Sequence, residues 1–226
     1  MTNLIFLLQF FLILLIFVFP PLFVDFSDNL ALDFSKFNYF ALISLVLALF
    51  LYLQDRRERF FEGKEVQENK KTLWKAVDWT GGYFLTFGSL VLCAAIIELA
   101  NLALKTKNFE SIIFPSNFLQ GLFCAFALAA SAFYEECLYR LYLPNALKKI
   151  SARGGTKSIW LCEAACVLLF AFAHRYQGLL ALLNAFLAGI ILRLSFIKSK
   201  SLWPPFFAHL SYNAAALLFY KVTLVP

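Results

Sequence analysis

Long apolar stretches are the feature of this sequence that most limits its fold. A helix needs about 20 mostly apolar residues to cross a bilayer, and seven stretches of the 226-residue chain approach that length with few or no charges. They are residues 3–24, 37–54, 79–104, 118–147, 158–174, 178–192 and 202–220. Because a segment in lipid must satisfy its own backbone hydrogen bonds, we expect an all-α fold, a multi-pass transmembrane bundle of about seven spans with a polar cavity inside.

The composition supports this class. Hydrophobic residues make up 62% of the chain and charged residues 15%, against roughly 25% charged in a typical soluble domain. A chain of this size cannot bury so many apolar side chains in one soluble core, and it is too apolar to be disordered. The sequence therefore predicts an integral membrane protein with the lipid bilayer as its main partner.

The basic residues predict the orientation of the spans. With the N-terminus in the cytoplasm, the inner loops 55–78, 148–157 and 193–200 hold 14 of the 20 Lys and Arg residues. Cytoplasmic loops are usually the ones enriched in Lys and Arg. The net charge of +6 therefore follows a membrane pattern, and we expect no nucleic-acid partner.

Ionisable and amide side chains lie inside three predicted spans, where each charge costs roughly 2.5–3.5 kcal/mol on insertion scales. The group comprises Glu135, Glu136 and Arg140 in the fourth span, His174 in the fifth, and His209 and Asn213 in the seventh. Both histidines of the chain belong to it. Polar residues placed at such a cost indicate a buried pairing or a functional site.

Helical spacing separates the roles of the fourth-span residues. Successive α-helical residues turn by about 100°, so Glu135 and Glu136 are expected to address different points. Glu136 and Arg140 are four residues apart and are predicted to form an internal ion pair. Glu135 is then the acid left free to face the cavity.

Spacing and depth relate the other two spans to the first. Phe170 and His174 are four residues apart, as are His209 and Asn213, so each pair shares a helix face. With a rise of 1.5 Å per residue, Glu135, His174 and Asn213 all lie roughly 20–25 Å from the inner charged loops. We therefore expect groups from three helices to converge on one site.

These residues resemble the pattern of the CAAX-processing and bacteriocin-processing (CPBP, or Abi) intramembrane proteases, which is EExxxR, then FxxxH, then HxxxN or HxxxD. The match runs from Glu135 to Asn213 in the family's order. The resemblance divides the chain into N-terminal transmembrane helices with a cytoplasmic loop, residues 1–110, and a catalytic core of four helices, residues 111–226. It implies an endopeptidase acting on a peptide or membrane-protein substrate, located in the bacterial inner (cytoplasmic) membrane.

Roles for the site residues can be assigned within this resemblance. Glu135, assisted by His174, would deprotonate the attacking water, and His209 with Asn213 would donate hydrogen bonds to the oxyanion. Glu136, Arg140 and Phe170 are predicted to be structural supports. A metal-dependent version stays open at this point, with zinc held by Glu135, His174 and His209, because the sequence has no HExxH motif to decide it.

Two other classes of function remain as alternatives. A bacteriocin-immunity or scaffold protein would keep the fold and use its carboxylates only for stability. A proton-coupled transporter would also place Glu and His near the midplane, although no internal repeat of the kind found in many transporters is visible. Five further polar residues in or near the spans match no motif and are expected to reach toward the span ends: Glu98, Asn101, Glu163, Asn184 and Arg193.

Overall fold

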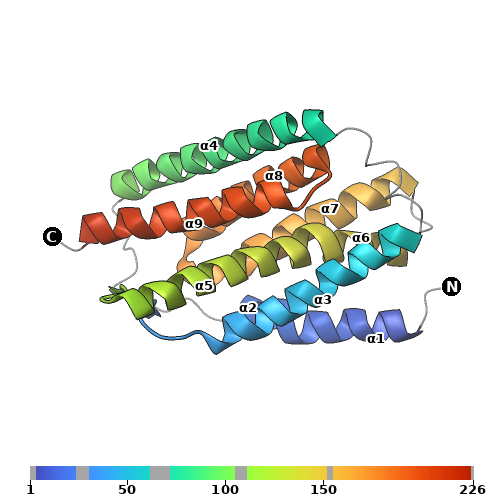
Figure 1. Ribbon diagram of the computed structural model, residues 1–226, viewed down its shortest axis with the longest axis horizontal. Coiled ribbons are helices and arrows are strands. Elements are labelled where there is room, and N and C mark those ends of the chain that lie inside the picture. The colour runs from blue at the N-terminus through green and yellow to red at the C-terminus, as the bar shows by residue number, and fades with distance from the viewer. Residues whose placement is uncertain (1–3, 24–30, 62–71, 105–110, 152–154, 225–226) are drawn as a thin grey trace.

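A bundle of long helices forms the fold in the computed structural model (Figure 1). The structure describes residues 4–23, 31–61, 72–104, 111–151 and 155–224. The helices are α1 (Leu4–Ile13), α2 (Phe19–Phe23), α3 (Tyr39–Phe61), α4 (Thr72–Leu104), α5 (Phe118–Glu135), α6 (Leu143–Ile150), α7 (Gly155–Phe172), α8 (Leu179–Ser199) and α9 (Trp203–Leu224). The predicted all-α, multi-pass class is confirmed.

Six segments of the described chain have the length and apolar composition of a membrane span. They are Leu4–Phe23, Tyr39–Glu58, Trp79–Ala103, Phe118–Ile150, Gly155–Phe172 and Leu179–Ser199, which correspond to the first six predicted spans. The seventh predicted span forms α9, but this helix is not among the six because polar residues in its first half lower its hydropathy. It packs against α4, α5 and α8.

One predicted loop is wrong. Residues 193–200 were expected to form an inner loop, yet α8 continues to Ser199 and ends where Lys200 adopts a left-handed conformation. Arg193 is buried within the helix and paired with Glu163 of α7. The charge that looked like the end of a span is neutralised by a neighbouring helix, so the helix does not need to stop there.

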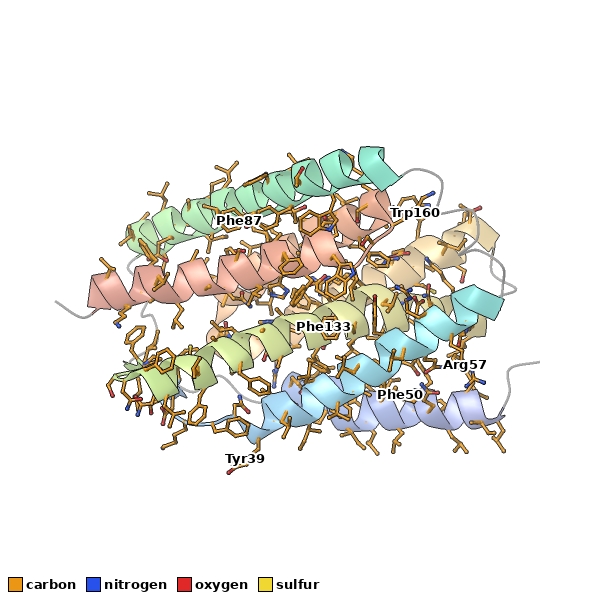
Figure 2. All side chains as sticks on the ribbon, in the orientation of Figure 1. Tyr39, Phe50, Arg57, Phe87, Phe133 and Trp160 are labelled. Atoms are coloured by element: carbon orange, nitrogen blue, oxygen red, sulfur yellow. The ribbon has the colours of Figure 1, made fainter. Side chains whose placement is uncertain are left out.

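The centre of the bundle is formed by α5 and the segment that follows it. Helices α3 and α9 pack directly on α5. Helices α7 and α8 contact the segment that follows α5. Helix α4 lies outermost and packs against α8 and α9. Phe133 of α5 is buried, whereas Phe50 and Trp160 lie on the outside of the bundle (Figure 2). Apolar side chains therefore cover both the inside and the outside, as a lipid-embedded bundle requires.

A short parallel strand pair joins two connecting segments. β1 (Ala31–Asp33) pairs with β2 (Ser111–Ile113), with Leu32 opposite Ile112. Hydrogen bonds from Ser35 and Lys36 lower the pKa of Asp33 to about 2, so this carboxylate stays ionised at ordinary pH. The pair ties the chain before α3 to the chain before α5, and the sequence pattern did not predict it.

Candidate active site

The site is built around a π-helical segment, Glu136–Tyr142, which joins α5 to α6 within one continuous candidate span. All seven residues of this segment are buried. At its end the Leu143 amide donates to the Leu138 carbonyl five residues earlier, and the next residue is Pro144, which has no N–H. π-Helical turns are rare and frequently occur at functional sites, because they rotate side chains out of the regular α-helical register.

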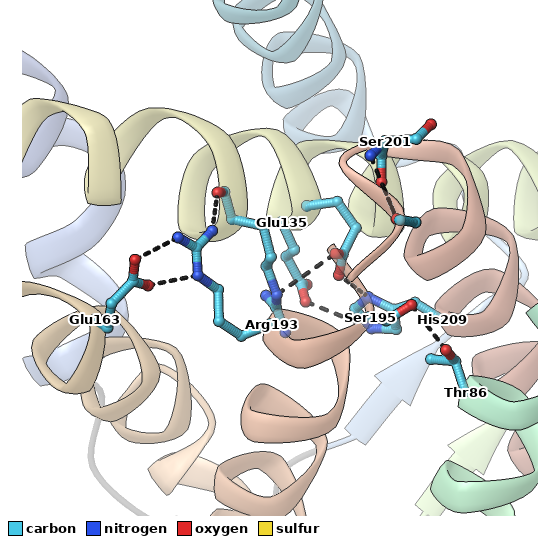
Figure 3. A network of polar contacts seen from close by, with 10 residues as sticks. Thr86, Glu135, Glu163, Arg193, Ser195, Ser201 and His209 are labelled. Carbon is cyan, nitrogen blue, oxygen red and sulfur yellow. Dashed lines mark hydrogen bonds and ion pairs between the residues drawn. The ribbon is translucent and has the colours of Figure 1, made fainter. Parts of the chain in front are cut away.

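The imidazole ring of His209 of α9 contacts both glutamates, and Figure 3 shows it close to Glu135. Its Nδ1 is 2.9 Å from Glu136 Oε1, and its Nε2 is 3.7 Å from Glu135 Oε2. The expectation that Glu135 and Glu136 address different points is therefore wrong. The 100° rule holds within a regular α-helix, but the π-helix begins at Glu136 and the two long side chains reach around the same imidazole.

The predicted ion pair between Glu136 and Arg140 is confirmed. Arg140 Nε lies 3.4 Å from Glu136 Oε2, and the side chains of both residues are almost completely buried. The Arg140 guanidinium also stacks over the Phe170 ring, 4.0 Å from its centroid. Glu136 thus contacts both the Arg140 cation and the His209 ring, so its supporting role includes a direct contact with a site residue.

Glu135 differs from Glu136 in its exposure. Its side chain is 19% exposed, whereas that of Glu136 is 0% exposed. The Oε2 atom of Glu135 is nevertheless buried and has no hydrogen-bond donor among the described residues. This oxygen is therefore an acceptor available to a water or a substrate.

Phe170 of α7 is the contact between the two histidines. Its ring centroid lies 4.8 Å from that of His174 and 6.3 Å from that of His209. The ring also packs edge-on against Tyr139, at 5.3 Å. Arg140, His174 and His209, one from each of three predicted spans, thus all contact one buried aromatic side chain.

His174 lies just beyond the end of α7, not inside the helix as predicted. The chain tightens there into a 3₁₀ helix, Arg175–Gln177, and turns at Gly178, whose φ of 100° suits glycine. Nδ1 of His174 is 2.9 Å from the Phe170 carbonyl oxygen. Because a carbonyl oxygen only accepts, Nδ1 carries the proton and a neutral His174 ring has its lone pair on Nε2.

Asn213 lies one helical turn after His209 on α9 and is half-buried. Within the described part of the chain, no side chain or backbone group hydrogen-bonds to its amide, which leaves both amide atoms for another partner.

The neighbouring Tyr212 is held differently, because its hydroxyl accepts from Asn184 of α8 at 2.8 Å. The predicted outward reach of Asn184 is therefore wrong, since its amide pairs between helices.

Tyr176 is a residue of this region that the sequence reasoning missed. Burial raises the pKa of its phenol, the Gln177 hydrogen bond lowers it, and the charge of Glu135 raises it again. The phenol is therefore within electrostatic range of the Glu135 carboxylate. Its position two residues after His174 was the signal that could have identified it.

Glu163 and Arg193 also take part in a buried network, although no role was assigned to them. Arg193 Nε and Nη2 donate to the two Glu163 oxygens at 2.5 and 2.6 Å. Lys148 of α6 donates to Glu163 at 2.6 Å, so one carboxylate binds two cations. The expectation that both residues reach to the span ends is wrong, because they pair with each other inside the bundle.

The donors of the site do not gather into a metal centre in this arrangement. Among the described residues, no three His, Cys, Asp or Glu side chains lie close enough to hold a metal ion. Glu135 and His209 approach each other at 3.7 Å, but His174 does not join them within such a cluster. The zinc ligand set considered from the sequence therefore does not form a three-ligand cluster here.

Gly189 of α8 lets Phe170 take its position. A Cβ atom at Gly189 would lie 3.1 Å from Phe170 Cδ1 and 3.3 Å from Val167 Cγ1. We expect Gly189→Ala to destabilise the protein by about 1–3 kcal/mol through overpacking and to lower activity by displacing Phe170. Thermal unfolding in detergent measures the first effect and a cleavage assay the second.

Gly88→Ala on α4 is the matched control for Gly189→Ala. A Cβ atom there meets nothing within 4 Å, and replacing a mid-helix glycine by alanine is favourable by roughly 0.5–1 kcal/mol. Equal unfolding temperatures for the two variants would show that the Phe170 contact does not limit the packing of α8.

The comparison with known proteins agrees with the geometry of this site. Residues 117–215 match the family described as type II CAAX prenyl endopeptidase Rce1-like. The match begins at Asn117, the N-cap of α5, and includes every residue of the predicted site. No curated protein and no solved structure matches the chain. The part of the chain that holds the site is thus similar to the type II CAAX prenyl endopeptidases, a group of the CPBP/CAAX proteases that the sequence motifs resemble.

Proposed function

We propose that the protein hydrolyses a peptide bond of a membrane-associated substrate by means of a water activated by Glu135. The observation that carries the proposal is the Glu135 carboxylate, whose buried Oε2 lacks a donor among the described residues and lies 3.7 Å from His209 Nε2. A carboxylate in such a setting suits proton transfer, and the adjacent imidazole can act on the same reacting group.

In the proposed reaction, the water gives a proton to Glu135 while its oxygen adds to the scissile carbonyl carbon. His174, with its lone pair on Nε2, accepts a second hydrogen bond and orients the water. Asn213 donates a hydrogen bond to the oxyanion. His209 donates a second from Nε2 in its doubly protonated form, because its Nδ1–H faces the Glu136 carboxylate. When the tetrahedral intermediate collapses, the C–N bond breaks and Glu135 returns the proton to the leaving amine. Peptide plus water thus becomes an acid and an amine.

A cleavage assay tests this function. The purified protein is reconstituted in liposomes with an isoprenylated CAAX-type peptide, with the same peptide lacking the lipid, and with each in the presence of EDTA. We expect release of the C-terminal fragment, measured by mass spectrometry, that survives the chelator. Loss of cleavage in EDTA and recovery with zinc would overturn the metal-free chemistry. No cleavage of either peptide, together with full biological effect of Glu135→Gln, would favour the scaffold alternative.

Asn213 is expected to act on turnover and not on binding. Because an oxyanion interaction exists mainly in the transition state, Asn213→Ala should lower kcat by about 10²–10³-fold and leave KM nearly unchanged. Steady-state kinetics on the reconstituted enzyme measure both constants. A raised KM with an unaltered kcat would mean that the Asn213 amide holds the substrate in its ground state.

We also propose that the N-terminus faces the cytoplasm. Lys157 is exposed near the start of α7, and Lys36 is exposed before α3. With the charge pattern of the loops, Lys157→Cys should react with an impermeant thiol reagent only from the cytoplasmic side, and Lys36→Cys only from outside. The reverse labelling of this matched pair would reverse the orientation.

A further inference from the structure

The backbone carbonyl of Arg140 cannot accept a hydrogen bond from the residue four positions later, as it would in a regular α-helix. The residue four positions later is Pro144, which has no N–H and whose ring crowds the carbonyl at that position. Arg193 of α8 donates a hydrogen bond to this carbonyl, from its Nη1 to the Arg140 oxygen at 2.5 Å. The guanidinium thus gives this buried carbonyl a hydrogen bond that Pro144 cannot provide.

The remaining donors of Arg193 fix the direction of its guanidinium. Its Nε and Nη2 form a two-point pair with Glu163 of α7 (Figure 3). Lys148 of α6 donates to the same carboxylate. The planar fork of arginine can bind a carboxylate through one edge while a further nitrogen addresses another acceptor. α6, α7 and α8 thus hold one backbone atom of the π-helical segment.

The Arg140 carbonyl is connected to the His209 imidazole through the Arg140 side chain and Glu136. Arg140 pairs through its side chain with Glu136, and Glu136 contacts His209 Nδ1 at 2.9 Å. We infer that Arg193 is a positioning residue, which holds the Arg140 carbonyl so that Glu136 keeps His209 oriented for the reaction. The inference rests on the proposed function for its effect on turnover.

A second place in the chain uses the same arrangement and provides a control. The Phe17 carbonyl lies four residues before Pro21 and accepts from the Tyr134 hydroxyl at 3.2 Å. Here, too, a side chain from another helix donates to a carbonyl that the proline four residues later cannot serve. The two sites are separate, so a substitution that restores one backbone N–H should not repair the other.

The test is a rescue experiment on the reconstituted full-length protein. Arg193→Gln should lower kcat by about 10- to 100-fold through displacement of the site, with KM changed by less than about threefold. Glu163 keeps Lys148 as its partner in this variant. Adding Pro144→Ala supplies an N–H four residues after Arg140, and the double variant should recover about half or more of the lost kcat on a logarithmic scale. Pro21→Ala is the matched proline control and should recover nothing.

A conservative variant and measurements of thermal stability complete the test. Arg193→Lys retains a cation beside Glu163 but lacks the rigid fork, so its kcat should fall between those of wild type and Arg193→Gln. The Tm of each variant in detergent should follow the same rescue by Pro144→Ala and not by Pro21→Ala. If Arg193→Gln does not fold, the Arg193→Lys pair of measurements is used in its place.

The outcomes separate this inference from the proposed function. An inactive wild-type protein would refute the proposed endopeptidase function. The Tm rescue would still decide whether the hydrogen bond from Arg193 to the Arg140 carbonyl stabilises the protein. An active wild type in which Arg193→Gln and Arg193→Lys retain full kcat would overturn the positioning role. Equal rescue by Pro21→Ala and Pro144→Ala would overturn it as well, because the effect would then be a general gain in helix stability.

Discussion

Glu135→Gln is expected to lower peptide hydrolysis by about 10²–10⁴-fold, the contribution of a positioned general base. The neutral amide keeps the shape of the side chain but cannot accept the proton of the attacking water. Because Glu135 is partly exposed and its Oε2 has no donor among the described residues, its loss should leave the unfolding temperature close to that of wild type. Single-turnover cleavage and thermal unfolding in the same detergent measure the two effects.

Glu136→Gln is the control for the assignment of roles to Glu135 and Glu136. The two acids are adjacent and both approach His209, so the substitutions are matched in chemistry and in place. An active Glu135→Gln beside a stable but inactive Glu136→Gln would show that the roles are reversed.

Glu136→Gln is also expected to have the largest effect on stability. Its side chain is fully buried between Arg140 and His209. Removing one partner of a buried ion pair leaves the other charge uncompensated, which typically costs about 3–5 kcal/mol. We expect a corresponding fall in the free energy of unfolding, measured by denaturant or thermal unfolding in detergent.

Glu58→Gln provides the matched comparison for this loss. Glu58 accepts from Lys149 at 2.5 Å, but both side chains are close to half exposed. Exposed pairs contribute about 0–1 kcal/mol, so this variant should be nearly as stable as wild type. A similar loss in Glu58→Gln and Glu136→Gln would mean that burial of the Glu136–Arg140 pair carries no special cost.

The sequence predicted the helical class and six of the spans well, because hydropathy is a property of each segment on its own. It was less successful where the burial or pairing of a residue depends on a neighbouring helix. Arg193 reads as the end of a span until Glu163 is seen beside it. His209 and its neighbours were singled out as functional, yet they are also why α9 is less apolar than the six span candidates.

The candidate site divides in the same way. The spacing of Glu136 and Arg140 predicted their ion pair, since residues four apart meet on any helix of roughly α geometry. The position of Glu135 and Glu136 on either side of one imidazole was beyond such reasoning. It depends on a π-helical register that begins at Glu136 and on the rotation of α9 against α5.

By itself, the sequence determined that this chain lies in a membrane and which few polar residues share its interior, because the free energy of placing each side chain in lipid is local. The tertiary structure alone decided which of these residues meet. It placed the two glutamates at His209, Phe170 between the histidines, and Arg193 at the Arg140 carbonyl. Such contacts depend on how helices far apart in the chain pack and rotate, and no periodicity within one helix encodes that.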